Sequence, residues 1–584
     1  MPKGIAASPG IAIGKVYILE KKTFCILEYK IKKEELEKEI KRFKEAVEES
    51  KNQIRKIKEK VKEKIGEREA YIFQTYLSII EDPNLIDETI KKIKEQKINA
   101  ETALTESCNN FTERFKVVQT EFIEERSRDI ENATKRILHN LLKKPILSLS
   151  HLKENIVVVA YDLAPSDTVS MDKGKVLGFA TDIGGRTSHA AIMARALEIP
   201  AVVGLRDVTK KVKPGTTIII DGDKGYVIVN PASNQIRKYQ ERKKKLLVYR
   251  KNLEILRPLP PQTLDGREVE LAANIADQKE VDLAIKNGAE GVGLYRTEYL
   301  YMNRTTLPSE EEQLKAYSAV AKKVAPYSVI IRTLDIGGDK FLSPLPVPKE
   351  INPFMGWRAI RLSLELVDIF KTQLRAILKA AQHGKVKIMF PMVSSLEEVR
   401  KANSILNEVK KELEGEGVSL SNPVEMGIMI EVPAAAVIAD ILAKEVDFFS
   451  LGTNDLIQYT LAVDRVNEKV AHLYQPFHPT ILRLVNGVIK AAHRENIWVG
   501  ACGEMAGDPL GMAVLLGLGV DEFSIAPTSI LEIKKIIRNL SWEELQKIAN
   551  HLLKFSTSQQ TKRYLENKLG KRIRKILKGD NNAR

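Results

Sequence analysis

A histidine stands at the start of a predicted helix, in a setting suited to phosphate chemistry. The glycine pair 184–185 follows a strand-like run and permits a tight turn, and Thr187 or Ser188 can cap a helix over 190–197. His189 would lie in the first helical turn, where free backbone N–H groups and the positive end of the helix dipole favour a bound phosphate. The same positive end disfavours the imidazolium form. A lone histidine is more often structural, but this pattern favours a neutral, nucleophilic His189 at an exposed anion site.

A second set of reactive side chains recurs where strand-like runs end in the C-terminal half of the chain. Surface salt bridges would explain any one of them, but their recurrence run after run favours a site. Guanidinium forks bind phosphate and carboxylate groups bidentately. Mg²⁺ typically takes one or two protein carboxylates plus substrate oxygens. The residues are Asn274, Arg296, Arg332, Met392, Glu431, Asn454 with Asp455, Cys502 and Ser524, and nearby loops add Arg358 and Arg465.

The elements that carry this second set have the count of a closed barrel. Strand-like runs begin near 269, 291, 328, 386, 427, 447, 497 and 522, and most are followed by a segment long enough for a helix. Eight such units predict a (β/α)8 barrel, whose active residues lie where the strands end. Cys502 follows a predicted buried strand, so a structural thiol is one interpretation. Its place at the catalytic face supports a general acid instead.

The first 260 residues predict smaller units. Residues 30–142 are Lys- and Glu-rich with apolar residues three and four apart, which is typical of helical hairpins. Strand-like runs over 155–160, 175–180, 216–221 and 226–229 alternate with glycine and proline and predict a small α/β domain. A charged helix over 234–256 leads to the Pro-rich segment 257–261, which ends a helix and stiffens a linker.

Composition excludes several classes of protein. Of 584 residues, 43% are hydrophobic and 29% charged, which fits a globular chain. Three cysteines, odd in number and far apart, argue against a disulfide framework and for a reducing cytoplasm. The N-terminus does not read as a signal peptide, and the longest apolar run, 511–520, is too short for the roughly 20 residues of a membrane span.

The charge balance is basic but uneven. The formal net charge is +15, and residues 562–584 hold nine Lys or Arg and two acids. We interpret this tail as a solvated terminal helix rather than a nucleic-acid-binding arm, because aromatic interleaving is limited to Tyr564. Neither nucleic-acid binding nor membrane insertion is expected.

Two long motifs in order resemble a known family. Residues 184–195 resemble the phosphohistidine signature of the Enzyme I family of the bacterial sugar phosphotransferase system, the phosphoenolpyruvate-protein phosphotransferases. Residues 447–465 resemble its phosphoenolpyruvate and metal signature, and residues 4–10 its N-terminal strand. The resemblance runs from Gly4 to about residue 570.

The resemblance implies a multidomain α/β architecture. A swivelling α/β phosphohistidine domain would comprise residues 1–20 and 146–232, with an all-α helical-hairpin domain, 21–145, inserted in it to bind a carrier protein. A helical and proline-containing linker, 233–261, would lead to a (β/α)8 TIM barrel, 262–570, that binds phosphoenolpyruvate and forms a homodimer. Residues 571–584 would be a basic tail.

The resemblance also implies roles for the candidate residues in a cytoplasmic enzyme. Phosphoenolpyruvate would phosphorylate His189, which would pass the group to a histidine of the phosphocarrier protein HPr. Cys502 would protonate the departing enolpyruvate to give pyruvate, and the cofactor would be Mg²⁺, with Mn²⁺ as an alternative. The implied substrate ligands are Arg296, Arg332, Asn454, Asp455 and Arg465, assisted by Arg358, and the implied metal ligands are Glu431 and Asp455.

Two alternatives explain less of the chain. A nucleotide-dependent relative of pyruvate phosphate dikinase or phosphoenolpyruvate synthase needs a further nucleotide-binding domain, but residues 1–150 are mostly helical and contain no Gly-rich phosphate loop. A non-enzymatic nucleic-acid-binding regulator would use the basic surface and would bind in a salt-sensitive way. It leaves the arginines, carboxylates and cysteine at the strand ends unexplained.

Overall fold

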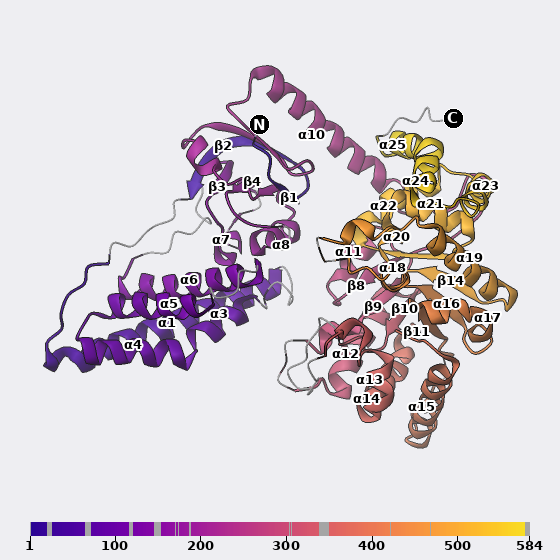
Figure 1. Ribbon diagram of the computed structural model, residues 1–584, viewed down its shortest axis with the longest axis horizontal. Helices are drawn as coiled ribbons and strands as arrows, with labels where there is room; N and C mark the ends of the chain where they lie inside the picture. The colour runs from indigo at the N-terminus through magenta and orange to yellow at the C-terminus, as the bar shows by residue number, and fades with distance from the viewer. Residues whose placement is uncertain are drawn as a thin grey trace. The chain divides into compact units, whose positions relative to one another are not determined.

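The chain divides into two compact units, Met1–Leu247 and Val248–Arg584, in a computed structural model (Figure 1). The structure describes residues 2–19, 26–64, 70, 72–115, 121–144, 154–169, 171–172, 174–185, 188–302, 304, 306–337, 350–420, 422–465, 467 and 469–578. The helix α10, Ser233–Glu254, runs from the first unit into the second.

A mixed sheet forms the centre of the first unit. Its strand order is β1-β5-β4-β3-β2-β6-β7 among the described residues. Strand β3 is buried along its whole length, as expected of an interior parallel strand. The strands are β1 Ile5–Ser8, β2 Ile11–Leu19, β3 Ile156–Ala160, β4 Val176–Thr181, β5 Ala201–Val203, β6 Thr217–Asp221 and β7 Tyr226–Val229.

A helical bundle is inserted between two neighbouring strands of this sheet. Strands β2 and β3 pair in parallel, although the bundle separates them in sequence. Apolar residues three and four apart, such as Phe43, Val47 and Ile54 on α1, meet in one buried cluster. The predicted insertion is therefore confirmed. The bundle contains α1 Leu36–Lys64, α3 Ile72–Ile80, α4 Pro83–Gln96, α5 Ala100–Phe115 and α6 Glu121–Leu141.

Several helices and strands of the first unit differ from the prediction. Residues 100–142, within the helical segment expected over 30–142, contain two helices, α5 and α6. Strands β2 and β5 were not predicted, because β5 has three residues between Pro200 and Gly204, and Gly14 and Lys15 interrupt the apolar run of β2. Small helices complete the unit: α7 Pro165–Val169, α8 His189–Ala196 and α9 Val208–Lys211.

Eight parallel strands of the second unit close into a barrel, in the order β10-β11-β12-β13-β14-β15-β8-β9. Each strand begins within one residue of its predicted start, so the predicted (β/α)8 barrel is confirmed. The strands are β8 Glu270–Ile275, β9 Val292–Arg296, β10 Ser328–Arg332, β11 Lys385–Phe390, β12 Met426–Ile430, β13 Phe448–Leu451, β14 Trp498–Ala501 and β15 Glu522–Ile525.

Helices surround the barrel and bury the outer faces of its strands in one large apolar core. Ser309 and Ser395 begin two of them as capping boxes with glutamates three residues on. The larger helices are α11 Glu280–Lys286, α12 Glu310–Val324, α13 Ile360–Glu365, α14 Val367–Ala380, α15 Leu396–Gly415, α18 Thr453–Leu461, α19 Pro479–Arg494, α21 Pro509–Leu518, α22 Ile530–Ile537, α23 Trp542–Leu552 and α24 Ser558–Leu565. Short helices follow two of the strands: α16 Pro433–Val437 and α17 Ala439–Leu442 come after β12, and α20 Glu504–Gly507 comes after β14.

The start of the predicted basic tail packs on the barrel unit. Helix α25, Lys571–Lys578, buries Ile573 and Ile576 in the barrel's outer core. Arg572 pairs with Glu544 of α23 at 2.6 Å. The segment is therefore an amphipathic helix up to residue 578, and residues 579–584 lie outside the described residues. None of the helices in the described residues is both long and apolar enough to span a membrane.

The inside of the barrel is apolar in one part and polar at the carboxyl ends of the strands. Successive side chains of a strand point alternately into the barrel and out towards the helices. A small apolar cluster of Leu294, Ile330, Met389, Met429 and Phe448 lies apart from the outer core and includes Cys502. Polar strand-end residues lie beyond it at the carboxyl ends of the strands, where the site is expected.

Acidic residues occupy the opposite, amino-terminal ends of the strands. Glu270 and Glu522 are direct neighbours in the register of β8 and β15. Glu522 is buried, and its Oε1 has no hydrogen-bond partner among the described residues. Burial first, and then Glu270, raise the pKa of Glu522 well above its ordinary value, while Lys387 opposes the shift and Glu425 adds to it. Like charges side by side on neighbouring strands destabilise a sheet.

We predict that Glu522→Gln stabilises the barrel unit at alkaline pH. The folded chain keeps a proton on Glu522 that the unfolded chain releases above about pH 4.5, so native stability falls as pH rises from there towards the raised pKa. Glutamine removes this loss, and we expect a gain of about 1–3 kcal/mol in the free energy of unfolding at pH 8 that disappears near pH 4. Denaturant unfolding at both pH values measures it.

A neighbouring glutamate provides the control for Glu522→Gln. Glu425 accepts hydrogen bonds from Trp498 Nε1 at 3.2 Å and pairs with Lys387 Nζ at 2.9 Å. Glu425→Gln should therefore lower stability at pH 8. A Glu522→Gln variant that is also less stable at pH 8 would contradict the charge argument.

Candidate active site

His189 is the first residue of α8, directly after a glycine turn. Gly184 has φ +116°, a conformation that side chains rarely adopt, so the predicted tight turn is confirmed. Ser188 occupies the cap position, but its hydroxyl donates to Gly185 O at 2.8 Å and makes no cap hydrogen bond. Ser188 is thus the N-cap residue, one of the two predicted candidates, but its hydroxyl bonds to the Gly185 carbonyl instead of to the first turn of α8. Thr187 lies outside the described residues.

The helical insert covers His189. Figure 1 shows α7 and α8 between the sheet and the bundle, and Asp129 Oδ1 of α6 lies 3.5 Å from His189 Nδ1. The histidine side chain is 24% exposed, so the exposed position expected from sequence is wrong. Burial first, and then the positive charge of Arg128, lower the pKa of His189 to about 4. The imidazole is therefore neutral at pH 7. Part of the cause is the inserted bundle, because Arg128 belongs to its helix α6.

In the barrel unit, two buried carboxylates fix Arg332, the last residue of β10. Its Nη2 lies 2.8 Å from Glu298 Oε1 and 3.1 Å from Asp335 Oδ2. Burial works against the charged form, but Glu298, Asp335 and Glu431 outweigh it and raise the pKa of Arg332. Arg332 Nε has no hydrogen-bond partner in the described part of the chain. A cation so held is suited to bind an anion.

Arg358 shares the same carboxylate. Its Nη2 donates to Asp335 Oδ1 at 2.8 Å and lies 3.7 Å from Asp455 Oδ2. Its Nη1 donates to the Tyr459 hydroxyl at 3.2 Å, and that hydroxyl donates to Phe354 O at 2.5 Å. Burial raises the pKa of Tyr459 to about 12, so the hydroxyl keeps its proton. Asp335 thus bridges two guanidinium groups, which are both buried.

The start of α18 and the loop after it add further predicted residues. Asn454 Oδ1 accepts a hydrogen bond from Glu504 N at 2.8 Å, and Arg465 Nη1 lies 3.4 Å from Glu504 Oε1. Glu504 therefore connects these two side chains. Arg296 ends β9 and makes no ion pair with any residue that the structure describes.

Glu431 and Asp455 are the two residues that were predicted to be metal ligands. They follow the neighbouring strands β12 and β13, and Glu431 Oε1 accepts a hydrogen bond from Met392 N at 2.7 Å. A Cβ at Gly452 would come within 2.9 Å of Glu431 Oε2, so only glycine lets this carboxylate lie over the end of β13. Burial first, and then Asp455 and Asp335, raise the pKa of Glu431 to about 8. Glu431 therefore holds a proton at neutral pH when no cation is bound, and a bound cation would favour the ionised carboxylate.

The donor set fits an ion shared with a substrate. Within the described residues, no group of three or more His, Cys, Asp or Glu side chains could enclose a metal alone. Mg²⁺ needs only one or two carboxylates when substrate phosphate and water complete its coordination. Glu431 and Asp455 meet that need.

Cys502 follows β14 at the base of the site. It is buried and free, as is Cys108, while Cys25 lies outside the described residues. Its Sγ accepts a hydrogen bond from the Ser450 hydroxyl at 3.4 Å. Burial raises the pKa of Cys502 to about 11, against the opposing effect of Ser450. The thiol therefore carries a proton at neutral pH, as a general acid requires.

The structure brings the predicted barrel residues to one end of the barrel, whereas His189 belongs to the other unit. It also adds residues that sequence reasoning missed: Glu298, Asp335, Ser450, Tyr459 and Glu504. The missed acids follow strand ends by only a few residues, which is a usable signal. The pairing of Asp335 with two arginines is visible only in the folded chain.

We predict that Asp335→Asn weakens substrate binding more than it weakens folding. The amide cannot hold two guanidinium groups as a carboxylate does, so Arg332 and Arg358 lose their shared partner. We expect kcat/KM for the anionic substrate to fall about 10- to 100-fold. Steady-state kinetics measure it, and Asp368→Asn, at an acid on the first turn of α14, is the control. Unchanged kcat/KM in Asp335→Asn would contradict the bridging role.

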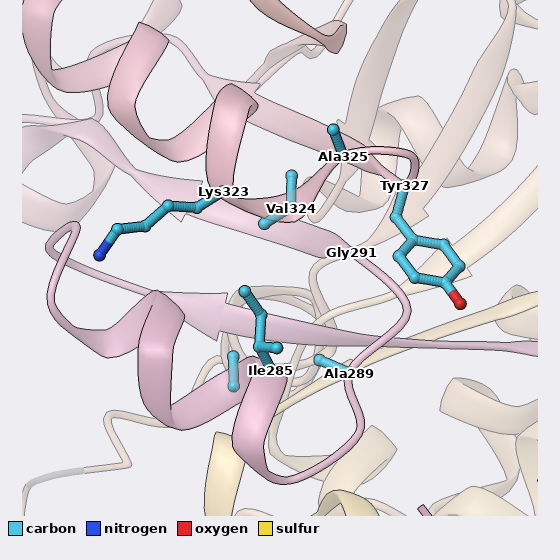
Figure 2. A pocket seen from close by; sticks show the side chains of 8 residues that line it. Ile285, Ala289, Gly291, Lys323, Val324, Ala325 and Tyr327 are labelled. Atoms are coloured by element: carbon cyan, nitrogen blue, oxygen red, sulfur yellow. The ribbon is translucent and has the colours of Figure 1, made fainter. Parts of the chain in front are cut away.

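A small surface cavity lies away from this site. It has a volume of about 80 Å³ and opens between α11, α12 and the start of β9 and β10 (Figure 2). Its lining includes Ile285, Ala289, Val324 and Tyr327. These residues belong to the amino-terminal side of the strands, so the cavity is not part of the candidate active site.

Comparisons with known proteins cover nearly the whole chain. Family models described as PEP-utilising enzyme match it at residues 3–126 (N-terminal), 152–225 (mobile domain) and 250–542 (PEP-binding domain). The chain is 49% identical to the phosphoenolpyruvate-protein phosphotransferase of Bacillus sp. (strain S), over 95% of this chain and 96% of the relative. It is 47% identical to the enzyme of that name from Staphylococcus aureus, over 96% of this chain and 97% of the relative. An NMR solution structure of Enzyme I (nEIt) is 44% identical over 42% of this chain and 99% of its own, with a TM-score of 0.36.

Proposed function

Because the chain belongs to the phosphoenolpyruvate-protein phosphotransferase family, we propose that His189 takes the phosphoryl group of phosphoenolpyruvate and passes it to a histidine of the phosphocarrier protein HPr. The chain is thus an enzyme of phosphoenolpyruvate-dependent phosphotransfer, the first step of the sugar phosphotransferase system. The observation that carries the proposal is the bridge of Arg332 and Arg358 by Asp335 at the end of the barrel where Cys502 lies.

The barrel site would bind phosphoenolpyruvate through its cations. Phosphoryl transfer depends mainly on positioning and on neutralising charge that spreads over the phosphate oxygens. Arg332 and Arg358 are fixed on buried carboxylates, and each has an Nε without a partner among the described residues. We assign these two, with Arg296, to the phosphate and carboxylate groups of the substrate. Arg465, Asn454 and Asp455 complete the set on the α18 side.

His189 would attack through Nε2. Asp129 lies beside Nδ1, which favours the tautomer with its proton on Nδ1 and leaves the Nε2 lone pair for phosphorus. An N–P bond forms as the P–O bond of phosphoenolpyruvate breaks. The released enolate takes the Cys502 proton at carbon three and becomes pyruvate.

Glu431 and Asp455 would hold Mg²⁺, with Mn²⁺ as an alternative. When bound, the ion would neutralise charge on the phosphate oxygens of the substrate. Both carboxylates also interact with the arginines: Asp455 Oδ2 lies 3.7 Å from Arg358 Nη2, and Glu431 helps to raise the pKa of Arg332. The carboxylates of Glu431 and Asp455 would therefore interact both with the metal ion and with the guanidinium groups of the arginines.

The two half-sites belong to different units, so the transfer requires them to come together. We propose that the α/β domain, 1–20 and 146–232, swivels on the linker 233–261 between the barrel, 262–570, and the carrier. The inserted bundle, 21–145, would bind HPr, because its helix α6 lies beside His189, the residue that would pass on the phosphoryl group. We further propose a cytoplasmic homodimer formed through the barrel.

The test is incubation with phosphoenolpyruvate and Mg²⁺, followed by intact mass and phosphosite mapping under conditions that preserve phosphohistidine. One phosphoryl group on His189 that needs the metal supports the proposal. Modification elsewhere, or none, overturns it. ATP in place of phosphoenolpyruvate is the control, and label from ATP would indicate a nucleotide-dependent relative instead.

A further inference from the structure

The buried hydroxyl of Ser450 contacts the Cys502 thiol. Ser450 lies in the middle of β13, and both it and Cys502 are nearly inaccessible to solvent, with 1% and 4% of their surface exposed. The Ser450 hydroxyl donates to Cys502 Sγ at 3.4 Å. In the part of the chain that the structure describes, no other donor is within hydrogen-bond distance of this sulfur.

The remaining surroundings of the thiol leave its own proton weakly held. Its closest acceptor is Leu451 O at 3.8 Å, which is a long and weak contact. Apolar side chains, among them Ile330, Met389 and Phe448, pack in the same inner cluster and offer nothing to a charge on sulfur. The backbone is fixed separately, because Asn274 Nδ2 donates to Cys502 O at 3.1 Å and Ser524 donates to Asn274 Oδ1 at 2.7 Å.

We propose that Ser450 is a positioning residue that enables Cys502 to protonate the enolate of pyruvate. The proposal rests on the proposed function. The Ser450 hydroxyl occupies a lone pair of the sulfur, so the S–H proton has only the long contact with Leu451 O to hold it and can be given to a substrate. When the proton leaves, the same hydroxyl is the hydrogen bond that the thiolate keeps.

Cys502 gives its proton directly to the enolate. The S–H bond breaks, a C–H bond forms at carbon three, and the enolate electrons close the carbonyl of pyruvate. The thiolate regains a proton from water before the next turnover. A hydrogen bond to an anion is stronger than one to a neutral thiol, so Ser450 stabilises the transition state more than the ground state.

Exchange of labelled pyruvate into phosphoenolpyruvate at equilibrium tests the proposal, because it needs only the full chain, both substrates and Mg²⁺. For Ser450→Ala we expect the maximal exchange rate to fall about 10- to 100-fold, as for a lost hydrogen bond to a charged group. The KM for phosphoenolpyruvate should stay within about twofold, and the solvent deuterium isotope effect should rise as proton transfer becomes limiting.

Two further variants separate the role of Ser450 from a loss of packing. Ser450→Thr keeps the hydroxyl on a residue that strands tolerate and should recover most of the rate. Ser318→Ala removes a buried hydroxyl on α12 that has no hydrogen-bond partner among the described residues, and should exchange like the parent chain.

The outcomes distinguish this inference from the proposed function. Parental exchange in Ser450→Ala, together with loss of exchange in Cys502→Ala, overturns the role of Ser450 alone. Parental exchange in Cys502→Ala removes the thiol from the reaction, and the role of Ser450 falls with it. A defect of Ser450→Ala confined to KM also overturns the inference, since it would mean that the hydroxyl serves substrate binding.

Discussion

Replacement of His189 by alanine is expected to abolish phosphorylation of the chain by phosphoenolpyruvate. The variant loses the nitrogen that forms the N–P bond, and no positioning of substrate in the barrel replaces it. We expect no measurable phosphohistidine and a loss of carrier phosphorylation of at least about 10⁴-fold. Intact mass after incubation with phosphoenolpyruvate and Mg²⁺ measures the first effect, and labelled transfer to HPr the second.

The control for this variant is another histidine of the same chain. His383 lies in the turn after α14, on the amino-terminal side of β11, and His383→Ala should be phosphorylated like the parent. A phosphoryl group that persists in His189→Ala and disappears in His383→Ala would overturn the assignment.

The pKa of His189 adds a second expectation. Since burial and Arg128 lower it to about 4, the imidazole stays unprotonated as pH falls from 8 to about 5, and its protonation should not slow phosphorylation in that range. Arg128→Gln removes the nearby positive charge and should move the pKa of His189 upward, which the pH dependence of its ring NMR signals measures. A downward shift would mean that Arg128 acts on His189 in another way.

The barrel could be predicted because its strands carry their own signal. Short apolar runs such as β10 end in a charged residue, and helices of regular length separate them, so the period and count alone predict a (β/α)8 barrel. The same rule places reactive side chains at the carboxyl ends of the strands. Strand β5 was not predicted, because its three residues are too few to show the apolar pattern of a strand.

The neighbours of the reactive residues could not be predicted in this way. Asp129 belongs to a helix of the insert, and the helical pattern does not distinguish it from the many other polar residues there. In the folded chain its Oδ1 lies 3.5 Å from His189 Nδ1. Asp335 is buried outside the two motifs, and Ser450, although it lies within the motif 447–465, has only the pattern of a buried strand residue. Arg358, the second partner of Asp335, is 23 residues away in the chain, and Cys502, the partner of Ser450, is 52 residues away, so only the folded barrel brings these pairs together.

Replacement of Arg332 by lysine is expected to cost the enzyme most of its activity while keeping the charge. Arg332 uses one nitrogen, Nη2, to hold Glu298 and Asp335, and its fork leaves other donors for a substrate anion. An ammonium group has a single nitrogen, so it cannot satisfy two buried carboxylates and also bind phosphate bidentately. We expect kcat/KM for phosphoenolpyruvate to fall about 10²- to 10⁴-fold.

The control is Arg400→Lys. Arg400 of α15 forms an exposed ion pair with Glu445, and because an exposed pair tolerates either cation, this variant should change kcat/KM by less than about twofold. If Arg332→Lys instead kept parental kcat/KM, charge alone would suffice at the end of β10, and the fork geometry that joins Glu298, Asp335 and the substrate would have no role in catalysis.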